Sequence, residues 1–356
     1  MSTPCIEAVR AKPLDRRLTS SFEISLGTQT ALQNVAVEVE TTDGITGVGE
    51  AAPVPHITGE TQETALAAVE TAAEVVDGMA VADVRGISNR LGDALSAQRA
   101  ARAGVEIAVF DALTRSLDVS LAAFVGGRNA PVRTDDTIGL VTPDAAATDA
   151  RDAVAAGFDE LKIKIGEDVE RDLARVEAVR DAAPAAGLKV DANQGYTPAD
   201  AIAFADRARE HGLDIDLFEQ PVPADAVGDL RRVRDAVRIP VAADESVFSR
   251  EDAARIATMD AADVINVKLA KTGVVETLDI VSLAVSHDLE LMIGCMLESS
   301  IGLRAAAHIV AGTGAFSSVD LDGNTSLEAD VVESSYGPTI PVAGPGIGVD
   351  VDFDTL

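Results

Sequence analysis

Apolar and polar residues alternate over residues 35–50. Val35, Val37 and Val39 are apolar at every second position, which is typical of a strand with one buried face. Asp43-Gly44 follows, a residue pair that favours the tight turn of a hairpin, and a second apolar stretch returns after it. The segment is therefore predicted to be a β-hairpin.

Helical spacing replaces this alternation further along the chain. Two alanine-rich segments, residues 61–76 and 97–116, place apolar side chains three and four positions apart, as in amphipathic helices. A hairpin followed by helices differs from a strand–helix–strand unit. Residues 1–125 are therefore predicted to form a compact α+β domain.

From about residue 132, short apolar strands alternate with helical segments. This alternation predicts a parallel sheet with crossover helices, and eight repeats of about 25–30 residues match a TIM-type (β/α) barrel. The predicted strands end near Leu140, Ile165, Asp191, Glu219, Ala243, Lys268, Gly294 and Asp320. We predict that the barrel spans residues 126–328, and that a Pro- and Gly-rich segment, 329–356, returns to the first domain.

Composition narrows the class of protein. The 356 residues carry a net charge of −30 and are 47% hydrophobic, which excludes a disordered acidic protein. Nucleic acid is not an expected partner, because no basic stripe is present. Residues 1–12 resemble no secretory leader, and no apolar run reaches the ~18 residues that span a bilayer. We expect a cytoplasmic protein without a membrane partner, in which Cys5 and Cys295 are reduced.

Lysine is scarce, since only six of the 29 basic residues are lysine. A GC-rich genome or a salt-adapted, halophilic proteome would each explain this bias, and we predict the latter. The six are Lys12, Lys162, Lys164, Lys189, Lys268 and Lys271. Four of them stand in two close pairs, which a depleted composition does not explain.

The first pair lies on the second predicted barrel strand. With a period of two, Lys162 and Lys164 point into the barrel while Ile163 and Ile165 point outward. Ammonium groups inside a barrel are costly unless they are paired or chemically used. A purely structural pair, extended to the rim or neutralised by carboxylates, is the alternative.

Three successive strands end in carboxylates, at Asp191, Glu219 and Asp244. The active site of such barrels lies at these strand ends, so the three groups are predicted to be neighbours. Like charges held close repel unless a hard divalent cation binds them, and Mg²⁺ prefers oxygen ligands. Helix N-capping is the alternative for any one of them. We predict one Mg²⁺ at these three residues.

The sixth strand places Asn266 and Lys268 on the inner face, opposite the second strand in an eight-stranded barrel. Lys164 and Lys268 would then flank a bound substrate and exchange a proton on opposite faces of one carbon. A proton next to a carboxylate is weakly acidic unless the enediolate is stabilised by a metal. The lysine base must also be neutral, which Lys162 and the metal would favour by lowering its pKa. Lys271 is expected at a loop or helix start.

These residues lie in motifs that resemble the enolase superfamily, muconate-lactonizing-enzyme subgroup. The motifs are Leu161-Lys162-Ile163-Lys164, Asp191-Ala192-Asn193-Gln194-Gly195, Phe218-Glu219-Gln220-Pro221, Ala243-Asp244-Glu245-Ser246 and Asn266-Val267-Lys268-Leu269. The resemblance implies an α+β cap over a (β/α)7β barrel, one Mg²⁺ per subunit and α-proton abstraction. It also implies that Lys164 and Lys268 are the two acid/base catalysts, with Lys162 tuning the first. We further expect a homo-oligomer.

Among the subgroup's activities, the end of strand eight resembles the dipeptide epimerases. Asp320 and Asp322 share one face, and the Asp-x-Asp of those enzymes holds the free ammonium group of the substrate. A solvated acidic turn is the structural alternative. The alternative activities are o-succinylbenzoate synthase, N-acylamino acid racemase and muconate cycloisomerase.

Further substrate contacts are expected from Asn193 after strand three and from Cys295, Met296 and Glu298 after strand seven. Cys295 is expected to be a packed residue and not a nucleophile. Residues 56–60 resemble the cap loop of the same subgroup.

Side-chain specificity is expected in the mobile stretch 18–29, where Glu23 occupies the position of an arginine in relatives that take acidic dipeptides. The second residue of the substrate is therefore predicted to be cationic or hydrophobic and not glutamate.

Overall fold

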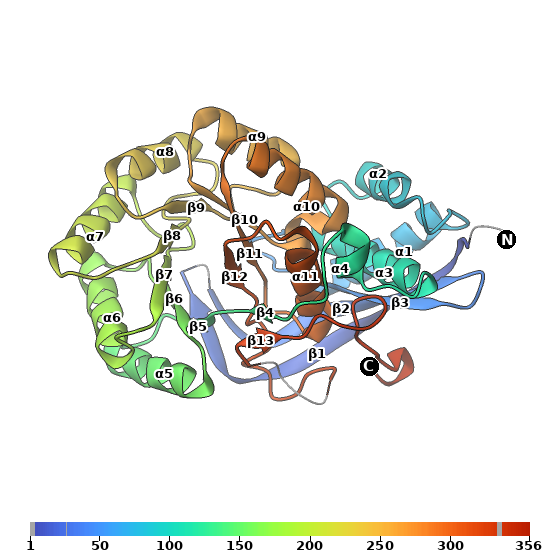
Figure 1. The fold of residues 1–356 in the computed structure, drawn as a ribbon, viewed down its shortest axis with the longest axis horizontal. Coiled ribbons are helices and arrows are strands. Elements are labelled where there is room, and N and C mark those ends of the chain that lie inside the picture. Colours follow the sequence, from blue (N-terminus) through green and yellow to red (C-terminus); the bar gives the residue numbers. More distant parts are fainter. Residues whose placement is uncertain (1–3, 26, 333–336) are drawn as a thin grey trace.

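The computed structural model describes residues 4–25, 27–332 and 337–356. Figure 1 shows a ring of helices around a strand barrel, with a smaller sheet and helices lying against one side of it. The barrel is built from the middle and late parts of the chain, and the smaller unit, here called the cap, from the first part. A cap packed against a barrel is the predicted fold class.

Eight parallel strands form one sheet in sequential order from β5 to β12. Seven helices, α5 to α11, join consecutive strands, so the (β/α)7β architecture is confirmed. The strands are β5 Asp136–Ile138, β6 Glu160–Lys164, β7 Gly187–Asp191, β8 Leu217–Glu219, β9 Val241–Ala243, β10 Val264–Val267, β11 Glu290–Gly294 and β12 Ser318–Asp320. The helices are α5 Pro143–Ala156, α6 Val169–Ala182, α7 Pro198–Glu210, α8 Val227–Ala236, α9 Arg250–Met259, α10 Leu269–Ser286 and α11 Ser300–Thr313.

Local sequence explains where these helices start. Thr142 and Thr197 accept hydrogen bonds from the first turns of α5 and α7, and proline follows each of them at the first helical position. On β6, Ile163 packs outward in the core between sheet and helices, while the lysines beside it face inward. The fold therefore points polar side chains of the strands into the barrel interior.

The cap contains the antiparallel sheet β1 (Ile6–Ile24), β2 (Gly27–Thr41) and β3 (Thr46–Ala51). The predicted hairpin is the β2–β3 pair, in which Val35 lies opposite Ala51. The sequence pattern missed β1. Residues 18–29, which we took for a mobile stretch, form the far end of the β1–β2 hairpin, apart from residue 26, which lies outside the described residues.

The cap helices are α1 (Gln62–Val76), α2 (Val84–Ala94), α3 (Arg99–Ser116) and α4 (Leu121–Val125). Helices α1 and α3 match the predicted pair, and α2 was not predicted. Two glycines of β3 allow α3 to approach: a Cβ on Gly47 would lie 2.2 Å from the Ala112 nitrogen, and one on Gly49 only 2.1 Å from the Gly104 oxygen. The sheet thus packs directly on the α3 backbone.

The C-terminal segment crosses back over both parts. Strand β13 (Thr339–Ile340) pairs with β4 (Val132–Arg133), which precedes the barrel. The last turn, 353–355, brings Phe353 into a small core with Leu14 and Leu18 of the cap. This segment therefore ties the cap to the barrel.

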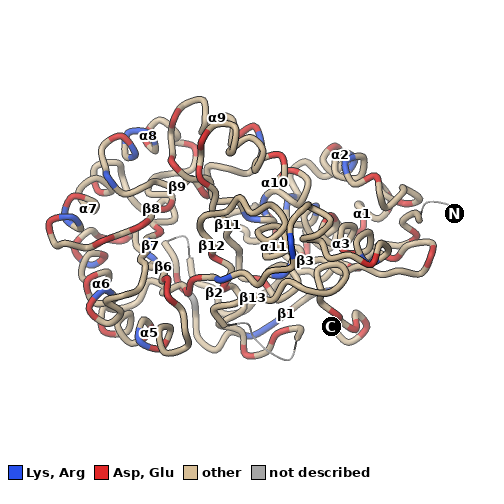
Figure 2. The backbone as a smooth tube through the Cα atoms, in the orientation of Figure 1, with Lys and Arg blue, Asp and Glu red and all other residues tan. Residues whose placement is uncertain are grey.

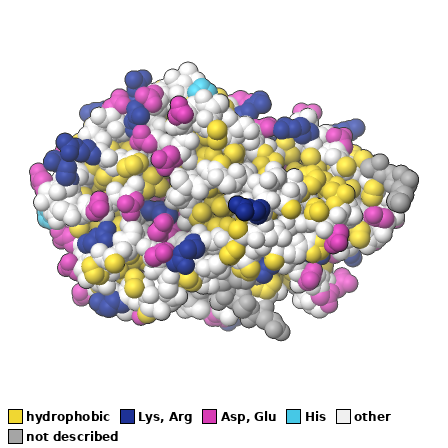
Figure 3. All heavy atoms as spheres, in the orientation of Figure 1, with side chains coloured by type: hydrophobic (Ala, Val, Ile, Leu, Met, Phe, Trp, Pro, Cys, Tyr) yellow, Lys and Arg dark blue, Asp and Glu magenta, His cyan; other side chains and the backbone are white. Residues whose placement is uncertain are grey.

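Acidic residues line the outer helices α5 to α9 in Figure 2. The face drawn in Figure 3 mixes basic and acidic side chains and shows no basic stripe. Among the described residues, no helix is both long and apolar enough to cross a membrane. Five of the six lysines are buried, with exposed fractions of 1–6%, and only Lys12 lies outside the barrel.

Candidate active site

A pocket lies between the cap and the C-terminal ends of the barrel strands. The cap contributes Ile24, Gln29, Val54, His56 and Ile57 to its lining. The barrel side contributes Thr137, Lys162, Lys164, Asn193, Lys268, Cys295, Met296, Leu297, Asp320, Asp322, Gly323, Thr325 and Ser326. This is the strand end at which TIM-type barrels carry their active sites.

Both lysines of β6 face this pocket and are buried. Lys164 Nζ lies 2.6 Å from Asp191 Oδ2. Lys162 Nζ contacts three carboxylates, at 3.0 Å from Asp191, 2.8 Å from Glu219 and 2.7 Å from Asp320. Burial alone lowers the pKa of Lys162, but the three negative charges outweigh it and raise the pKa well above its usual value. Lys162 is thus a fixed cation at the centre of the acidic groups.

The three predicted metal ligands are carried by successive strands. Asp191 and Glu219 end β7 and β8, Asp244 follows β9, and all three are buried. Burial, with the nearby charge of Asp191, raises the pKa of Glu219 to about 7. Burial also raises the pKa of Asp244, but Lys268 and Lys271 more than reverse this and lower it.

This donor set fits a hard divalent cation. Asp191, Glu219 and Asp244 supply only carboxylate oxygens, which are the ligands that Mg²⁺ prefers. Among the described residues, the acidic trio whose oxygens lie within 4.8 Å of one another is a different one, described below. The oxygens of all three are already held against lysine ammonium groups, so these buried carboxylates demand positive charge.

Lys268 follows β10, which lies four places from β6 in the eight-strand order and so across the barrel from Lys164. Its Nζ is 2.9 Å from Asp244 Oδ2. Burial lowers the pKa of Lys268, but Asp244 outweighs this effect and raises it. On the same strand, Asn266 donates to Glu219 Oε1 at 2.6 Å. Both inward positions predicted for this strand are thus occupied as expected.

Lys271 has a larger part in the site than its sequence position indicated. It lies at the start of α10, as expected, but its buried Nζ lies 2.5 Å from Asp244 Oδ1 and 2.6 Å from the Asp244 carbonyl oxygen. The left-handed Gly273 (φ +68°) interrupts α10 directly after this turn. Two lysines therefore hold the same carboxylate from two sides.

Asp320 and Asp322 both line the pocket, on the chain that leaves β12. Asp322 Oδ2 accepts the Thr137 N–H at 2.6 Å, so the first barrel strand orients it. Burial and the charge of Asp320 raise the pKa of Asp322 to about 6. The close pair therefore favours a cation or a proton between its members.

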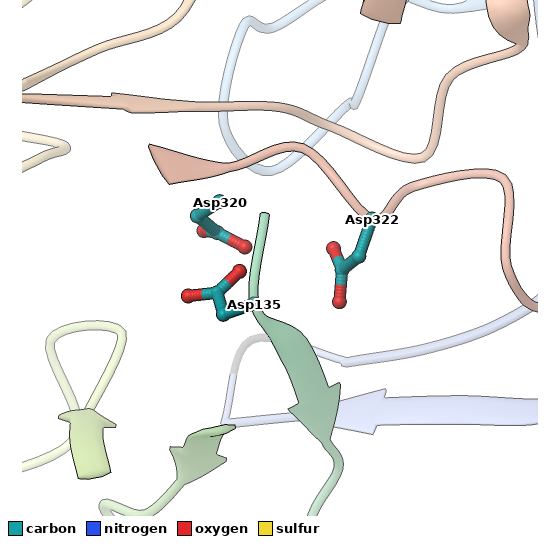
Figure 4. A group of neighbouring side chains, drawn as sticks. All are labelled: Asp135, Asp320 and Asp322. Atoms are coloured by element: carbon teal, nitrogen blue, oxygen red, sulfur yellow. The ribbon is translucent and has the colours of Figure 1, made fainter. Parts of the chain in front are cut away.

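A third carboxylate, Asp135, lies beside this pair (Figure 4). One oxygen from each of Asp135, Asp320 and Asp322 lies within 4.8 Å of the others, and among the described residues this is the acidic trio close enough to share an ion. It is distinct from the three predicted metal ligands. Burial, against the attraction of Lys189, raises the pKa of Asp135 well above its usual value. Sequence analysis assigned no role to Asp135 or Lys189. Lys189 could have been found, because it stands two positions before Asp191 and so shares its inward face.

Two of the predicted substrate contacts, Glu23 and Glu298, do not line this pocket as the structure describes it. Glu23 is exposed and is not part of the pocket lining of the described residues, and its neighbour Ile24 faces the pocket instead. Glu298 is turned into the protein, where it accepts the Met296 N–H at 2.8 Å. Alternation along β1 places adjacent residues on opposite faces, so a shift of one position reverses the assignment.

The remaining predicted contacts line the pocket. Asn193 faces it and donates to Glu245 Oε1 at 3.0 Å. Cys295 and Met296 form part of the wall, and burial raises the pKa of the Cys295 thiol well above its usual value. A thiol with a raised pKa is a poor nucleophile, in line with a packed residue.

Comparison with known proteins extends the likeness over nearly the whole chain. Residues 6–126 match the mandelate racemase / muconate lactonizing enzyme N-terminal domain, and residues 145–355 match the enolase C-terminal domain-like model. An aromatic dipeptide epimerase of Herpetosiphon aurantiacus is 40% identical over 89% of this chain and 89% of its own length. An L-Ala-D/L-Glu epimerase of Thermotoga maritima is 36% identical, covering 90% of this chain and 94% of its own.

A solved structure shares the same fold. The dipeptide epimerase of Enterococcus faecalis, crystallised with Mg and the dipeptide L-Leu-L-Tyr, superimposes with a TM-score of 0.94 at 34% identity, covering 97% of this chain and 99% of that one. The chain therefore belongs to the mandelate racemase / muconate lactonizing enzyme family of the enolase superfamily.

Proposed function

We propose that this protein is a Mg²⁺-dependent dipeptide epimerase, an isomerase that inverts the α-carbon of the C-terminal residue of a dipeptide. The observation that carries the proposal is one pocket with a lysine on each side, Lys164 and Lys268, and a carboxylate pair, Asp320 and Asp322, at its end. The relatives named above support the same activity.

The two lysines perform the proton transfer. Lys164 removes or returns the α-proton on one face of the carbon, and Lys268 acts on the other, because they come from opposite sides of the barrel. Asp191, Glu219 and Asp244 would hold Mg²⁺, which would supply positive charge to offset the charge that develops on the substrate carboxylate. Lys162 is a positioning cation that keeps the carboxylates around it in place.

The free N-terminus of the substrate distinguishes this reaction from the alternatives. Asp320 and Asp322 offer anionic oxygens to an ammonium group, which suits a dipeptide. The substrates of o-succinylbenzoate synthase, N-acylamino acid racemase and muconate cycloisomerase carry no free ammonium. These activities are therefore disfavoured.

The pocket wall supports a hydrophobic second residue. Ile24, Val54 and Ile57 from the cap meet Met296 and Leu297 from the barrel, and these five side chains are apolar. Burying an apolar side chain there contributes about 1.5–3 kcal/mol. Of the two classes predicted from sequence, this wall favours the hydrophobic one. Cytoplasmic location, homo-oligomeric assembly and a halophilic source remain predictions from the sequence.

The test is a library of L-Ala-L-X dipeptides incubated with Mg²⁺ in D₂O and followed by NMR. We expect deuterium incorporation and epimerisation, strongest for apolar X. Asp322→Ala should lower kcat/KM about 10- to 100-fold, because it removes a charge-assisted hydrogen bond to the ammonium group. Asp159→Asn removes a mainly exposed carboxylate (side chain 68% exposed) and is the matched control. Preference for L-Ala-L-Glu would refute the hydrophobic assignment. Exchange only in N-acyl substrates would refute dipeptide epimerisation.

A further inference from the structure

Asp135 is a fully buried carboxylate next to the pocket with half of its hydrogen-bonding capacity unused. It directly precedes β5 and is 0% exposed. Its Oδ2 accepts a hydrogen bond from Lys189 Nζ at 2.9 Å, whereas its Oδ1 has no hydrogen-bond partner among the described residues. A buried carboxyl oxygen without a hydrogen-bond partner is costly, so this position calls for a further partner.

The two neighbouring carboxylates are arranged in the same way. Asp320 Oδ2 is held by Lys162 at 2.7 Å, and Asp322 Oδ2 accepts the Thr137 N–H at 2.6 Å. Asp320 Oδ1 has only a long contact, 3.5 Å, with the Thr137 hydroxyl. Figure 4 shows the carboxylates of Asp135 and Asp320 facing each other, with Asp322 on the other side of the chain segment that leads into β5 in this view. Each therefore has one engaged oxygen and one that is free or weakly held.

The three carboxylates are close enough together for one ammonium group to reach an oxygen of each. A primary ammonium directs three N–H bonds tetrahedrally, and acceptors about 2.8 Å from the nitrogen then lie about 4.6 Å from one another. One oxygen from each of the three carboxylates lies within 4.8 Å of the others. Lys162 and Lys189 each contact one member of this trio, Asp320 and Asp135, but both lysines also contact carboxylates outside it, so negative charge is in excess here and a bound ammonium reduces that excess.

We propose that Asp135 is a third carboxylate of the subsite that binds the substrate's free ammonium group, with Lys189 as the residue that positions it. The proposal rests on the proposed function in one respect, that the substrate carries a free N-terminus. Lys189 also lies 2.7 Å from Glu160 and 3.4 Å from the Val319 carbonyl oxygen. It thereby fixes Asp135 against β12, the strand that carries Asp320.

The test measures binding and not turnover. The dissociation constants of L-Ala-L-Phe and of N-propionyl-L-Phe, which lacks only the amino group, are determined by calorimetry on the Mg²⁺-loaded protein and its Asp135→Asn variant. We expect the variant to bind the dipeptide about 10- to 100-fold more weakly and the propionyl compound within about twofold of the wild type. Asp159→Asn, which removes an exposed carboxylate paired with Arg133, is the control and should leave both constants within about twofold.

A second measurement uses only the wild-type protein and can therefore be made even if the Asp135→Asn variant does not fold. N-methyl-L-Ala-L-Phe retains the charge but has lost one N–H, so three acceptors predict about tenfold weaker binding to the wild type, and two acceptors predict no loss. Equal binding of the methylated dipeptide, or equal weakening of both ligands in Asp135→Asn, would overturn the proposal. A second equivalent of Mg²⁺ bound by the wild type and lost in the variant would overturn it as well.

Solvent deuterium exchange in the same samples separates this proposal from the proposed function. Binding that depends on Asp135 without any α-proton exchange refutes the epimerase and leaves the subsite standing. Exchange with a dipeptide affinity that Asp135→Asn does not alter refutes the subsite and leaves the epimerase standing.

Discussion

Replacing Lys164 or Lys268 by arginine removes a base from the pocket while keeping its positive charge. Both ammonium groups are buried against carboxylates, Lys164 at 2.6 Å from Asp191 and Lys268 at 2.9 Å from Asp244. Breaking such a buried pair with alanine would cost about 3–5 kcal/mol of stability and would confuse folding with chemistry. The guanidinium group keeps the pair, and it cannot act as a base because it stays protonated.

The loss of rate follows from the missing proton transfer. A general base contributes about 10²- to 10⁴-fold, so each arginine variant should lose about 10³-fold in epimerisation, equivalent to about 4 kcal/mol in the barrier. The other lysine still serves its own face of the α-carbon. Each variant should therefore exchange the α-proton of one diastereomer in D₂O, and the two variants should exchange opposite ones.

NMR of the L,L and L,D forms of one apolar dipeptide with Mg²⁺ measures both quantities. Lys12→Arg is the control, because Lys12 lies in the cap outside the pocket lining of the described residues. The two-base arrangement is wrong if either arginine variant epimerises at a near wild-type rate. It is also wrong if both variants exchange the same diastereomer.

Two further predictions concern the cap and its contact with α11. Glu50 accepts hydrogen bonds from the backbone N–H groups of Ser299 and Gly302 at 3.0 and 3.1 Å. Glu50→Ala leaves these two buried donors without a partner and should lower the free energy of unfolding, measured by urea titration, by about 3 kcal/mol. A loss below about 1 kcal/mol would contradict this. Burial lowers the pKa of His308 to about 4, so the unfolded chain binds a proton more readily than the folded one below pH 6.5. The free energy of unfolding should therefore be highest above pH 6.5 and fall by up to about 3 kcal/mol as the pH drops towards 4. An equal fall in His308→Gln would rule out His308 as the cause.

Periodicity predicted the barrel well because its strands obey a strict rule. Each predicted strand end lies within two residues of the observed one, the largest shift being Leu140 against Ile138. The alternation within β6 and β10 placed Lys164 and Lys268 inward for the same reason. Strand β1 was not predicted because it depends on pairing with β2, and a local sequence pattern does not specify such pairing.

The residues that were missed share a different cause. Asp135 lies in the short connection before β5, and its role depends on Asp320, which is 185 positions away in the sequence. Lys271 was correctly predicted at a helix start. Its contact with Asp244 was not predicted, and it is made from the turn that precedes the interruption of α10 at Gly273. Such contacts depend on how the barrel closes, which no local spacing specifies.

The barrel interior explains where the few lysines of this chain are retained. Of the 29 basic residues, 23 are arginine and six are lysine. The described pocket lining nevertheless has three lysines and no arginine. An arginine could balance the carboxylates but could not exchange a proton, since its guanidinium does not deprotonate in proteins. Lysine is therefore required at Lys164 and Lys268 by the proposed chemistry. A compact point charge that fits among several carboxylates is what Lys162, Lys189 and Lys271 provide. A chain that otherwise uses arginine thus retains lysine where the barrel interior needs either a base or a small cation.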